Sequence, residues 1–169
     1  MRAPQLVVVE YDGWIARHLS DIAAEGAWLV RGTKGVEAGL ALARERRPCV
    51  LVVQVELAED KLAALRLIAD ARRECPDVPV VAVSDVKLND ADRVAWTAAL
   101  FDLGARYVLF PPLTKPVLED VISGLMASAI HRAAGDGRAA PNPPAGAPKR
   151  VRPKPADDVI DLADEELHE

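Results

Sequence analysis

Reactive side chains are sparse at the places where this 169-residue chain could do chemistry. If its apolar runs form an open parallel sheet, sites are expected at the carboxyl ends of the strands. Those ends carry a carboxylate, an amide, a hydroxyl and a proline, and no nucleophile is paired there with a base. The positions are Glu10 followed by Tyr11 and Asp12, then Gln54, Ser84 and Pro111.

Two of these groups are weak candidates for catalysis on their own chemistry. The amide of Gln54 is a poor nucleophile and a weak ligand for Mg²⁺. Ser84 has no histidine placed to activate it, because His18, His131 and His168 lie far apart in the pattern. We therefore interpret Gln54 as a polar strand end that is hydrogen-bonded within the loops, and Ser84 as a hydroxyl on the approach to the next helix rather than a nucleophile.

Motifs for cofactors and metals are absent from the sequence. It has no GxGxxG, P-loop or HExxH pattern, and the stretch EYDGW lacks the hydroxyl and glycine residues that would cradle a flavin phosphate. Cys49 and Cys75 lack metal-ligand spacing and are expected to be reduced thiols. We expect no catalytic residue, no cofactor and no metal ion.

Short β-branched runs alternate with longer amphipathic stretches, which predicts an α/β fold. Near-continuous Val and Leu in the runs is typical of a parallel sheet covered on both faces. The predicted fold is a doubly wound five-stranded sheet of the flavodoxin-like type. Strands are expected at 5–10, 27–32, 49–54, 78–84 and 106–110, and helices at 14–25, 35–47, 60–74, 90–103 and 114–132.

Several local signals mark the helix ends. Asn89 or Asp90 can cap the fourth helix, and Gly104 lies just past its last apolar residue, where a left-handed conformation is favoured. Pro116 falls in the first turn of the last helix, where proline is tolerated.

Composition and charge limit the class of partner. The net charge of −5 does not favour nucleic acid or a membrane surface. No apolar run approaches the roughly 18 residues of a membrane span, and the start MRAPQ lacks the apolar region of a signal peptide. We expect a cytoplasmic protein that binds no nucleic acid and does not insert into a membrane.

The composition divides the chain into three parts. Residues 1–134 form the predicted domain, 135–155 a linker rich in Pro, Ala and Gly, and 156–169 an acidic amphipathic tail peptide. The linker and tail are predicted to be disordered. The tail is either a solubilising extension or a docking peptide that binds in cis or in trans. Its candidate anchors are Val159, Ile160, Leu162 and Leu167.

Four stretches together resemble the receiver domains of two-component response regulators. They are LVVVEYDGWIARHL, ERRPCVLVVQ, DVPVVAVSD and LGARYVLFPP, in order, within about residues 4–130. The resemblance implies a pocket in which an aspartate accepts a phosphoryl group, acids hold Mg²⁺, and a hydroxyl and a lysine contact the phosphoryl oxygens.

Carried over by position, most of that pocket is missing. Glu10 keeps the first acid, the second falls on Tyr11, and Asp12 is displaced by one residue. The acceptor position is Gln54 and the lysine position is Pro111.

Of the implied groups, Ser84 alone is retained, and Pro111-Pro112 is expected to keep the cis bond of the family. Glu56 and Glu59 are expected on an exposed loop and are poor replacement acceptors. The resemblance therefore implies a degenerate pseudo-receiver, held in one state, that is not phosphorylated on aspartate.

A partner surface is predicted on the fourth helix, which has two opposed apolar stripes where a surface helix normally has one. Register with the family turns Trp96, Leu100 and Leu103 toward the core. The face formed by the fourth helix, fifth strand and fifth helix then holds the partner candidates. They are Val94, Thr97, Phe101 and Tyr107, with Tyr107 one position before the aromatic position of the family, here Val108.

The function favoured by these observations is a phosphorylation-independent protein-protein interaction module in bacterial-type signalling or regulation. Its partner would be another signalling or regulatory protein, or a second copy in a homodimer. The alternatives are a flavodoxin-like cofactor-binding protein and an atypical response regulator controlled by another ligand. A transcription regulator is disfavoured, because no helix-turn-helix pattern follows residue 134.

Overall fold

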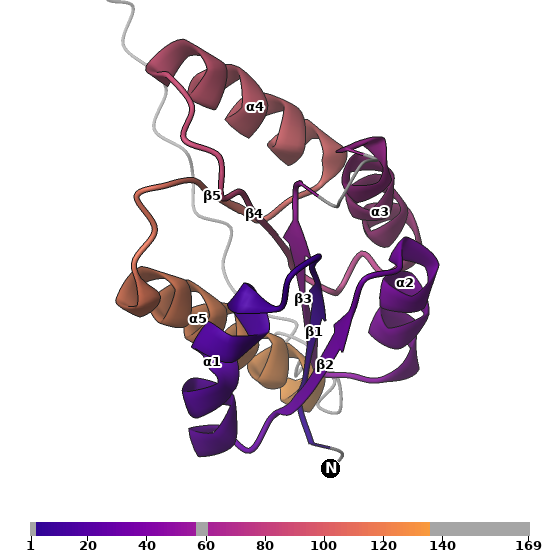
Figure 1. Cartoon of the computed structure of the whole chain (residues 1–169). Coiled ribbons are helices and arrows are strands. Elements are labelled where there is room, and N and C mark those ends of the chain that lie inside the picture. Colours follow the sequence, from indigo (N-terminus) through magenta and orange to yellow (C-terminus); the bar gives the residue numbers. More distant parts are fainter. Residues whose placement is uncertain (1–2, 57–60, 136–169) are drawn as a thin grey trace, which may run out of the picture. The chain divides into compact units, whose positions relative to one another are not determined.

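A computed structural model of the chain describes residues 3–56 and 61–135. Within them, five parallel strands form one sheet in the order β2-β1-β3-β4-β5, and a helix follows each strand (Figure 1). The predicted doubly wound α/β fold is confirmed. The elements are β1 (Gln5–Val9), α1 (Trp14–Glu25), β2 (Leu29–Thr33), α2 (Val36–Glu45), β3 (Cys49–Gln54), α3 (Lys61–Glu74), β4 (Val80–Val83), α4 (Asp90–Leu103), β5 (Tyr107–Leu109) and α5 (Lys115–Gly135).

Helices cover both faces of the sheet, with α1 and α5 on one face and α2, α3 and α4 on the other (Figure 1). Successive side chains of a strand point to opposite faces, so Leu6 and Val8 pack toward α1 and α5, while Val7 and Val9 pack toward α2 and α3. All four are fully buried. Burying such a side chain stabilises the fold by about 1.5–3 kcal/mol, which explains the continuous apolar runs.

Several element ends differ from the prediction by one to three residues. β4 begins at Val80 rather than at residue 78, because Pro79 has no N–H for the ladder, although its carbonyl accepts a 3.0 Å bond from the Leu51 amide. α2 ends at Glu45, and Arg46 is already extended on the approach to Pro48. α5 continues to Gly135 rather than ending at residue 132.

Both predicted ends of α4 are correct, and the cap left open between two residues is Asn89. Its side-chain oxygen accepts a 2.9 Å hydrogen bond from the Asp92 amide. At the other end, Gly104 has φ of 120°, and its amide donates to the carbonyls of Leu100 and Phe101. A Cβ at this glycine would lie within 2.6 Å of the Arg72 side chain, so glycine is required here on both counts.

The two stripes of α4 face different surroundings, as predicted. Leu100 is fully buried, and Trp96 and Leu103 pack against the core shared with α2 and α3. On the opposite stripe, Val94 is 69% exposed and Phe101 is 45% exposed. The core therefore takes one stripe and leaves the other as surface.

No helix in the described part of the chain is long and apolar enough to cross a membrane. The predicted tail anchors Val159, Ile160, Leu162 and Leu167, and the loop residue Glu59, lie outside the described residues.

Candidate functional site

The carboxyl edge of the sheet is built around Gln54, the last residue of β3, which is 2% exposed. Its side-chain oxygen accepts a 2.8 Å hydrogen bond from the Tyr11 amide. Its side-chain nitrogen donates a 3.3 Å bond to Oδ2 of Asp85. The glutamine thus links the loop after β1 to the loop after β4, as the hydrogen-bonded interpretation predicted. A carboxylate at this position could not donate to Asp85 and would repel it.

Glu10 acts as a helix cap supplied from outside the helix. It is 4% exposed at the end of β1. Its Oε2 accepts a 2.7 Å bond from the Ile15 amide, and its Oε1 a 3.0 Å bond from the Ala16 amide. These amides belong to the first turn of α1, whose N-cap residue, Gly13, provides no side-chain hydrogen bond. The carboxylate therefore satisfies two otherwise open donors at the positive end of the helix dipole.

Tyr11 and Asp12 face outward from this edge. Tyr11 is 53% exposed, and the Lys34 ammonium lies 5.3 Å from the centre of its ring. Asp12 is exposed as well. Asp12 therefore does not supply the second buried acid that the receiver resemblance implies.

Ser84 and Glu56 form a second link at the same edge. Ser84 is 1% exposed, and its hydroxyl donates a 2.5 Å hydrogen bond to Oε1 of Glu56. The other oxygen of Glu56 accepts from the Asp85 amide at 3.3 Å. Burial raises the pKa of Glu56, and the hydrogen bond from Ser84 opposes that rise.

The expectation of an exposed loop is wrong for Glu56, which is half-buried. Sequence reasoning missed it because its partner Ser84 is 28 positions away. Only the pairing of β3 with β4 brings the two together. The one available signal was that both residues follow adjacent strand ends. A small cavity of about 90 Å³ lies beside this pair, next to Trp96 and Phe110.

No amine lies at the end of β5. Pro111 stands where the receiver resemblance predicts a lysine, and the predicted cis bond of Pro111-Pro112 is present. The next lysine, Lys115, is turned toward α1, where its ammonium lies 2.7 Å from a carboxylate oxygen of Asp21. Its ammonium therefore does not lie at the carboxyl end of β5.

The residues of this edge do not fit the Mg²⁺ ion that the receiver resemblance implies. Both oxygens of Glu10 accept backbone amides, and the oxygen of Gln54 accepts another. Asp12 faces outward. Across residues 3–56 and 61–135, no group of three or more His, Cys, Asp or Glu side chains is placed to hold a metal ion. We therefore derive no chemical step through a metal at this edge.

A second candidate site is an apolar hollow of about 540 Å³ between α4, β5 and the start of α5. We call it the α4–α5 groove. Predicted partner residues Val94, Thr97 and Phe101 all line it, together with Val108, Leu113 and Val117. Tyr107 does not, because neighbouring residues of a strand face opposite sides, and it lines a different hollow beside α5. The prediction that Tyr107 shares the surface of Phe101 is wrong.

Comparisons with known proteins identify the fold. No family model matches the chain, and no curated protein matches its sequence. Solved structures do match, among them a CheY-like response regulator receiver domain protein from Methanospirillum hungatei, with 14% identity and a TM-score of 0.61. The match covers 78% of this chain and 99% of that one.

Two further matches are of the same kind. The receiver domain of NtrX from Brucella abortus has 20% identity and a TM-score of 0.59, covering 73% of this chain and 98% of that one. A response regulator from Burkholderia pseudomallei has 19% identity and a TM-score of 0.57, covering 80% and 73%. That protein was solved with a phosphorylated aspartic acid and a calcium ion.

The fold of this chain is that of receiver domains. In this fold, however, the end of β3 carries a buried amide whose donor and acceptor are both engaged.

Proposed function

We propose that this chain is a non-enzymatic protein-protein interaction module in signalling or regulation, and that it acts without aspartyl phosphorylation. The receiver fold supports the signalling role, because the similar solved structures include response regulators. The partner is another protein that binds the α4–α5 groove. The sequence also predicts two further possibilities: a homodimer with a second copy of this chain, and binding of a partner by the segment 156–169.

The independence from phosphorylation is supported by how the carboxyl edge is arranged. Phosphoryl transfer needs a carboxylate nucleophile and cations that neutralise the developing charge. The nucleophile position is the amide Gln54, and Pro111 stands in place of a cation. Glu10, the remaining buried acid at β1, caps α1. None of these three side chains is available to the reaction.

The single observation that carries the interaction role is the exposed apolar stripe of α4. Val94 and Phe101 are exposed on a helix whose other stripe already satisfies the core. They line a hollow that is open to solvent and continues onto Val117, itself 47% exposed. Contiguous apolar surface of this kind marks interaction sites more often than scattered single residues do.

The test is affinity capture from native lysate with the full chain as bait, comparing the unchanged chain with the double variant Val94→Glu and Phe101→Glu. A specific partner should be lost by at least tenfold, which corresponds to about 1.4 kcal/mol of binding free energy. A control for added surface charge is Leu62→Glu, which places one glutamate rather than two at a 56% exposed leucine on α3. That control should capture the partner normally.

Beryllofluoride with Mg²⁺ mimics the phosphorylated state of receivers and should leave capture unchanged. A partner that binds only with beryllofluoride would contradict phosphorylation independence. A partner that is retained by the double variant and lost in the Leu62→Glu control would contradict the assignment to the α4–α5 groove.

A further inference from the structure

A second, larger hollow lies at the amino ends of β4 and β5, on the other face of the sheet from the α4–α5 groove. Its volume is about 750 Å³. One wall is the side of α5 that carries Val121, Gly124 and Ser128, and the opposite wall is Pro76, Arg106 and Tyr107. We call it the amino-end hollow. It forms because β5 is the edge of the sheet and has no strand beyond it.

Cationic groups lie on the rim of this hollow. Arg106 is exposed and forms no side-chain ion pair within the described part of the chain. Arg132 is exposed, and it lowers the pKa of Asp77 less than Arg47 does. The guanidinium of Arg47 donates hydrogen bonds to both carboxylate oxygens of Asp77. Arg47 thus already neutralises Asp77. Of the other lining residues, Asp120 adds one negative charge. The rim therefore presents two arginines with unused donors.

The lining between the arginines is apolar and aromatic. Tyr107 is 45% exposed, and Val121 and Leu125 lie on the floor. A Cβ built on Gly124 would meet no atom within 4 Å, so the middle of the hollow is open space. A ligand that fits this hollow would place apolar side chains against Tyr107 and Val121 and carboxylates against the two arginines.

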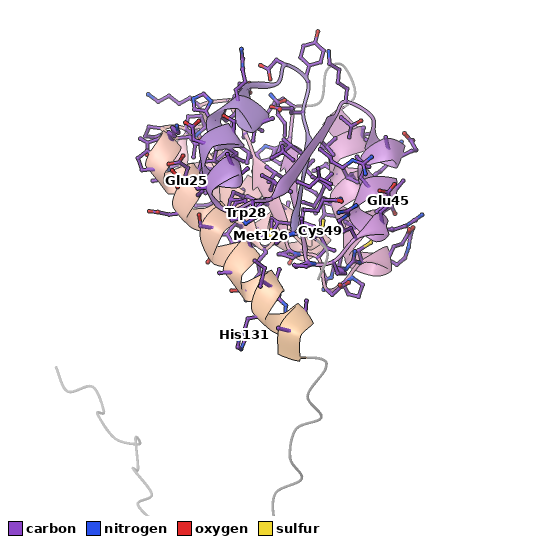
Figure 2. All side chains as sticks on the ribbon, turned by 90° about the horizontal axis from the view of Figure 1, so that it is seen from below. Glu25, Trp28, Glu45, Cys49, Met126 and His131 are labelled. Atoms are coloured by element: carbon purple, nitrogen blue, oxygen red, sulfur yellow. The ribbon has the colours of Figure 1, made fainter. Side chains whose placement is uncertain are left out.

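The hollow also continues toward the end of α5. A neighbouring hollow of about 470 Å³ shares Asp77 and Arg132 with it and is lined by His131 and Gly135. Figure 2 looks at the amino ends of the strands, and α5 runs past Met126 to His131 at its outer end. The described chain stops at Gly135, on the rim of these joined hollows.

We propose that the amino-end hollow binds residues 156–169 of the same chain, with the carboxylates of this segment on Arg106 and Arg132 and its apolar side chains against Tyr107 and Leu125. In sequence the segment has seven acids set among Val159, Ile160, Leu162 and Leu167. This is the alternation of apolar and negative groups that the lining selects. This contact is separate from the α4–α5 groove, which lies on the opposite face of the sheet.

The connection is long enough for this contact. Twenty residues, 136–155, separate Gly135 from Ala156. Twenty residues of a Gly-rich chain span about 25 Å on average, and prolines, of which this stretch has six, extend the reach further. The eleven residues of α5 between Gly124 and Gly135 rise only about 17 Å. A tether of this kind gives an effective concentration of the order of millimolar, so even a contact with a bimolecular Kd near that value would be occupied about half of the time.

The test places a nitroxide on the segment through Glu166→Cys in the full chain and records amide signals by NMR. Cys49 and Cys75 are each 1% exposed. Burial also raises the pKa of Cys49 to about 12, so the added thiol is the reactive one. We expect the amides of Tyr107, Gly124 and Ser128 to lose about half of their intensity or more. Signals of Val94 and Phe101 should not change.

Charge variants separate a specific contact from chance proximity. Arg106→Glu with Arg132→Glu should reduce the broadening at least about threefold, because exposed ion pairs contribute modestly and reversal adds repulsion. Adding Asp161→Lys and Asp164→Lys to that variant should restore it. The matched control is Arg66→Glu, an exposed arginine on α3, on the opposite face of the sheet (Figure 1). It should leave the broadening unchanged.

Three outcomes would overturn the proposal. The first is no broadening at the hollow in the unchanged full chain. The second is broadening centred on Val94 and Phe101, which would place the segment in the α4–α5 groove. The third is equal broadening when spin-labelled chain without ¹⁵N is mixed with ¹⁵N-labelled chain lacking the nitroxide, which would make the contact one between two copies.

Discussion

The carboxyl edge of the sheet and the α4–α5 groove are neighbouring regions with opposite chemistry. At the edge, Gln54, Glu10 and Ser84 are buried polar residues whose side chains bond to groups of this same chain. In the groove, Val94 and Phe101 are apolar side chains left in solvent. The polar groups of the edge are hydrogen-bonded within the protein, whereas the apolar groups of the groove are exposed to solvent.

The two regions differ in the free energy that a bound ligand would gain. A ligand at the edge would have to break short internal hydrogen bonds and leave buried groups unpaired, which costs about 1–3 kcal/mol for each group. A partner in the groove would only displace water from apolar surface, which is favourable. Binding therefore costs less free energy at the α4–α5 groove than at the carboxyl edge, which agrees with the proposed function.

The largest expected effect on stability is that of Gln54→Asp, which removes the hydrogen bond that Gln54 donates to Asp85. The new carboxylate would be buried beside Asp85 and could not donate to it, so we expect a loss of about 2–3 kcal/mol in the free energy of unfolding at neutral pH. Urea denaturation followed by tryptophan fluorescence measures it. Gln54→Glu keeps the length of the side chain and serves as the control for charge without shortening. A neutral or stabilising effect of Gln54→Asp would mean that the hydrogen bonds of Gln54 do not stabilise this edge of the sheet.

A smaller effect, dependent on pH, is expected from Glu56→Gln. Burial raises the pKa of Glu56 in the folded state above its usual 4.5. The contribution of a group with a raised pKa is fully present below its unfolded pKa and is lost as the pH rises through its folded pKa. The amide keeps an acceptor for Ser84 and does not titrate. The variant should therefore gain stability relative to the unchanged chain as the pH rises from about 4 to 7.

The expected gain from Glu56→Gln is below about 1 kcal/mol, because Glu56 is only half-buried and water screens its charge. Urea titrations of both chains at pH 4 and pH 7 measure it. An advantage of the variant that shrinks as the pH rises would contradict the assigned direction of the shift.

The smallest expected effect on stability is that of Phe101→Ser in the groove. Its side chain is 45% exposed, and changes at such surface positions usually alter the free energy of unfolding by no more than about 0.5 kcal/mol. The matched control is Leu100→Ser on the buried stripe of the same helix, which should cost at least about 2 kcal/mol. Thermal and urea denaturation of the two variants give the comparison. If Phe101→Ser cost as much as Leu100→Ser, the groove would be part of the core.

Local sequence signals were sufficient for the type and order of the elements. Asn89 and Gly104 delimit α4 because a cap and a left-handed residue act within one turn. The alternation of the β1 residues between two helical layers follows from the geometry of a strand. The role of Glu56 was not predictable in this way, because its bond to Ser84 joins two loops that are distant in sequence.

The side of β5 on which each residue lies also escaped sequence reasoning. Tyr107 and Val108 are adjacent, and the resemblance gave only their positions. Which one faces α4 depends on the register of β5 against β4, in which Val81 pairs with Tyr107 and Ala82 with Val108. A shift by one residue would exchange the two faces.

By itself, the sequence determined the parallel α/β layering, both ends of α4 and the amide Gln54 at the end of β3, since these depend on residue types and short spacings. Only the tertiary structure decided that Glu10 caps α1, that Glu56 bonds to Ser84, and that two hollows flank β5 on opposite faces. The physical reason is that burial and hydrogen-bond partners are set by strand order. The order β2-β1-β3-β4-β5 brings together strand ends that the linear chain keeps apart.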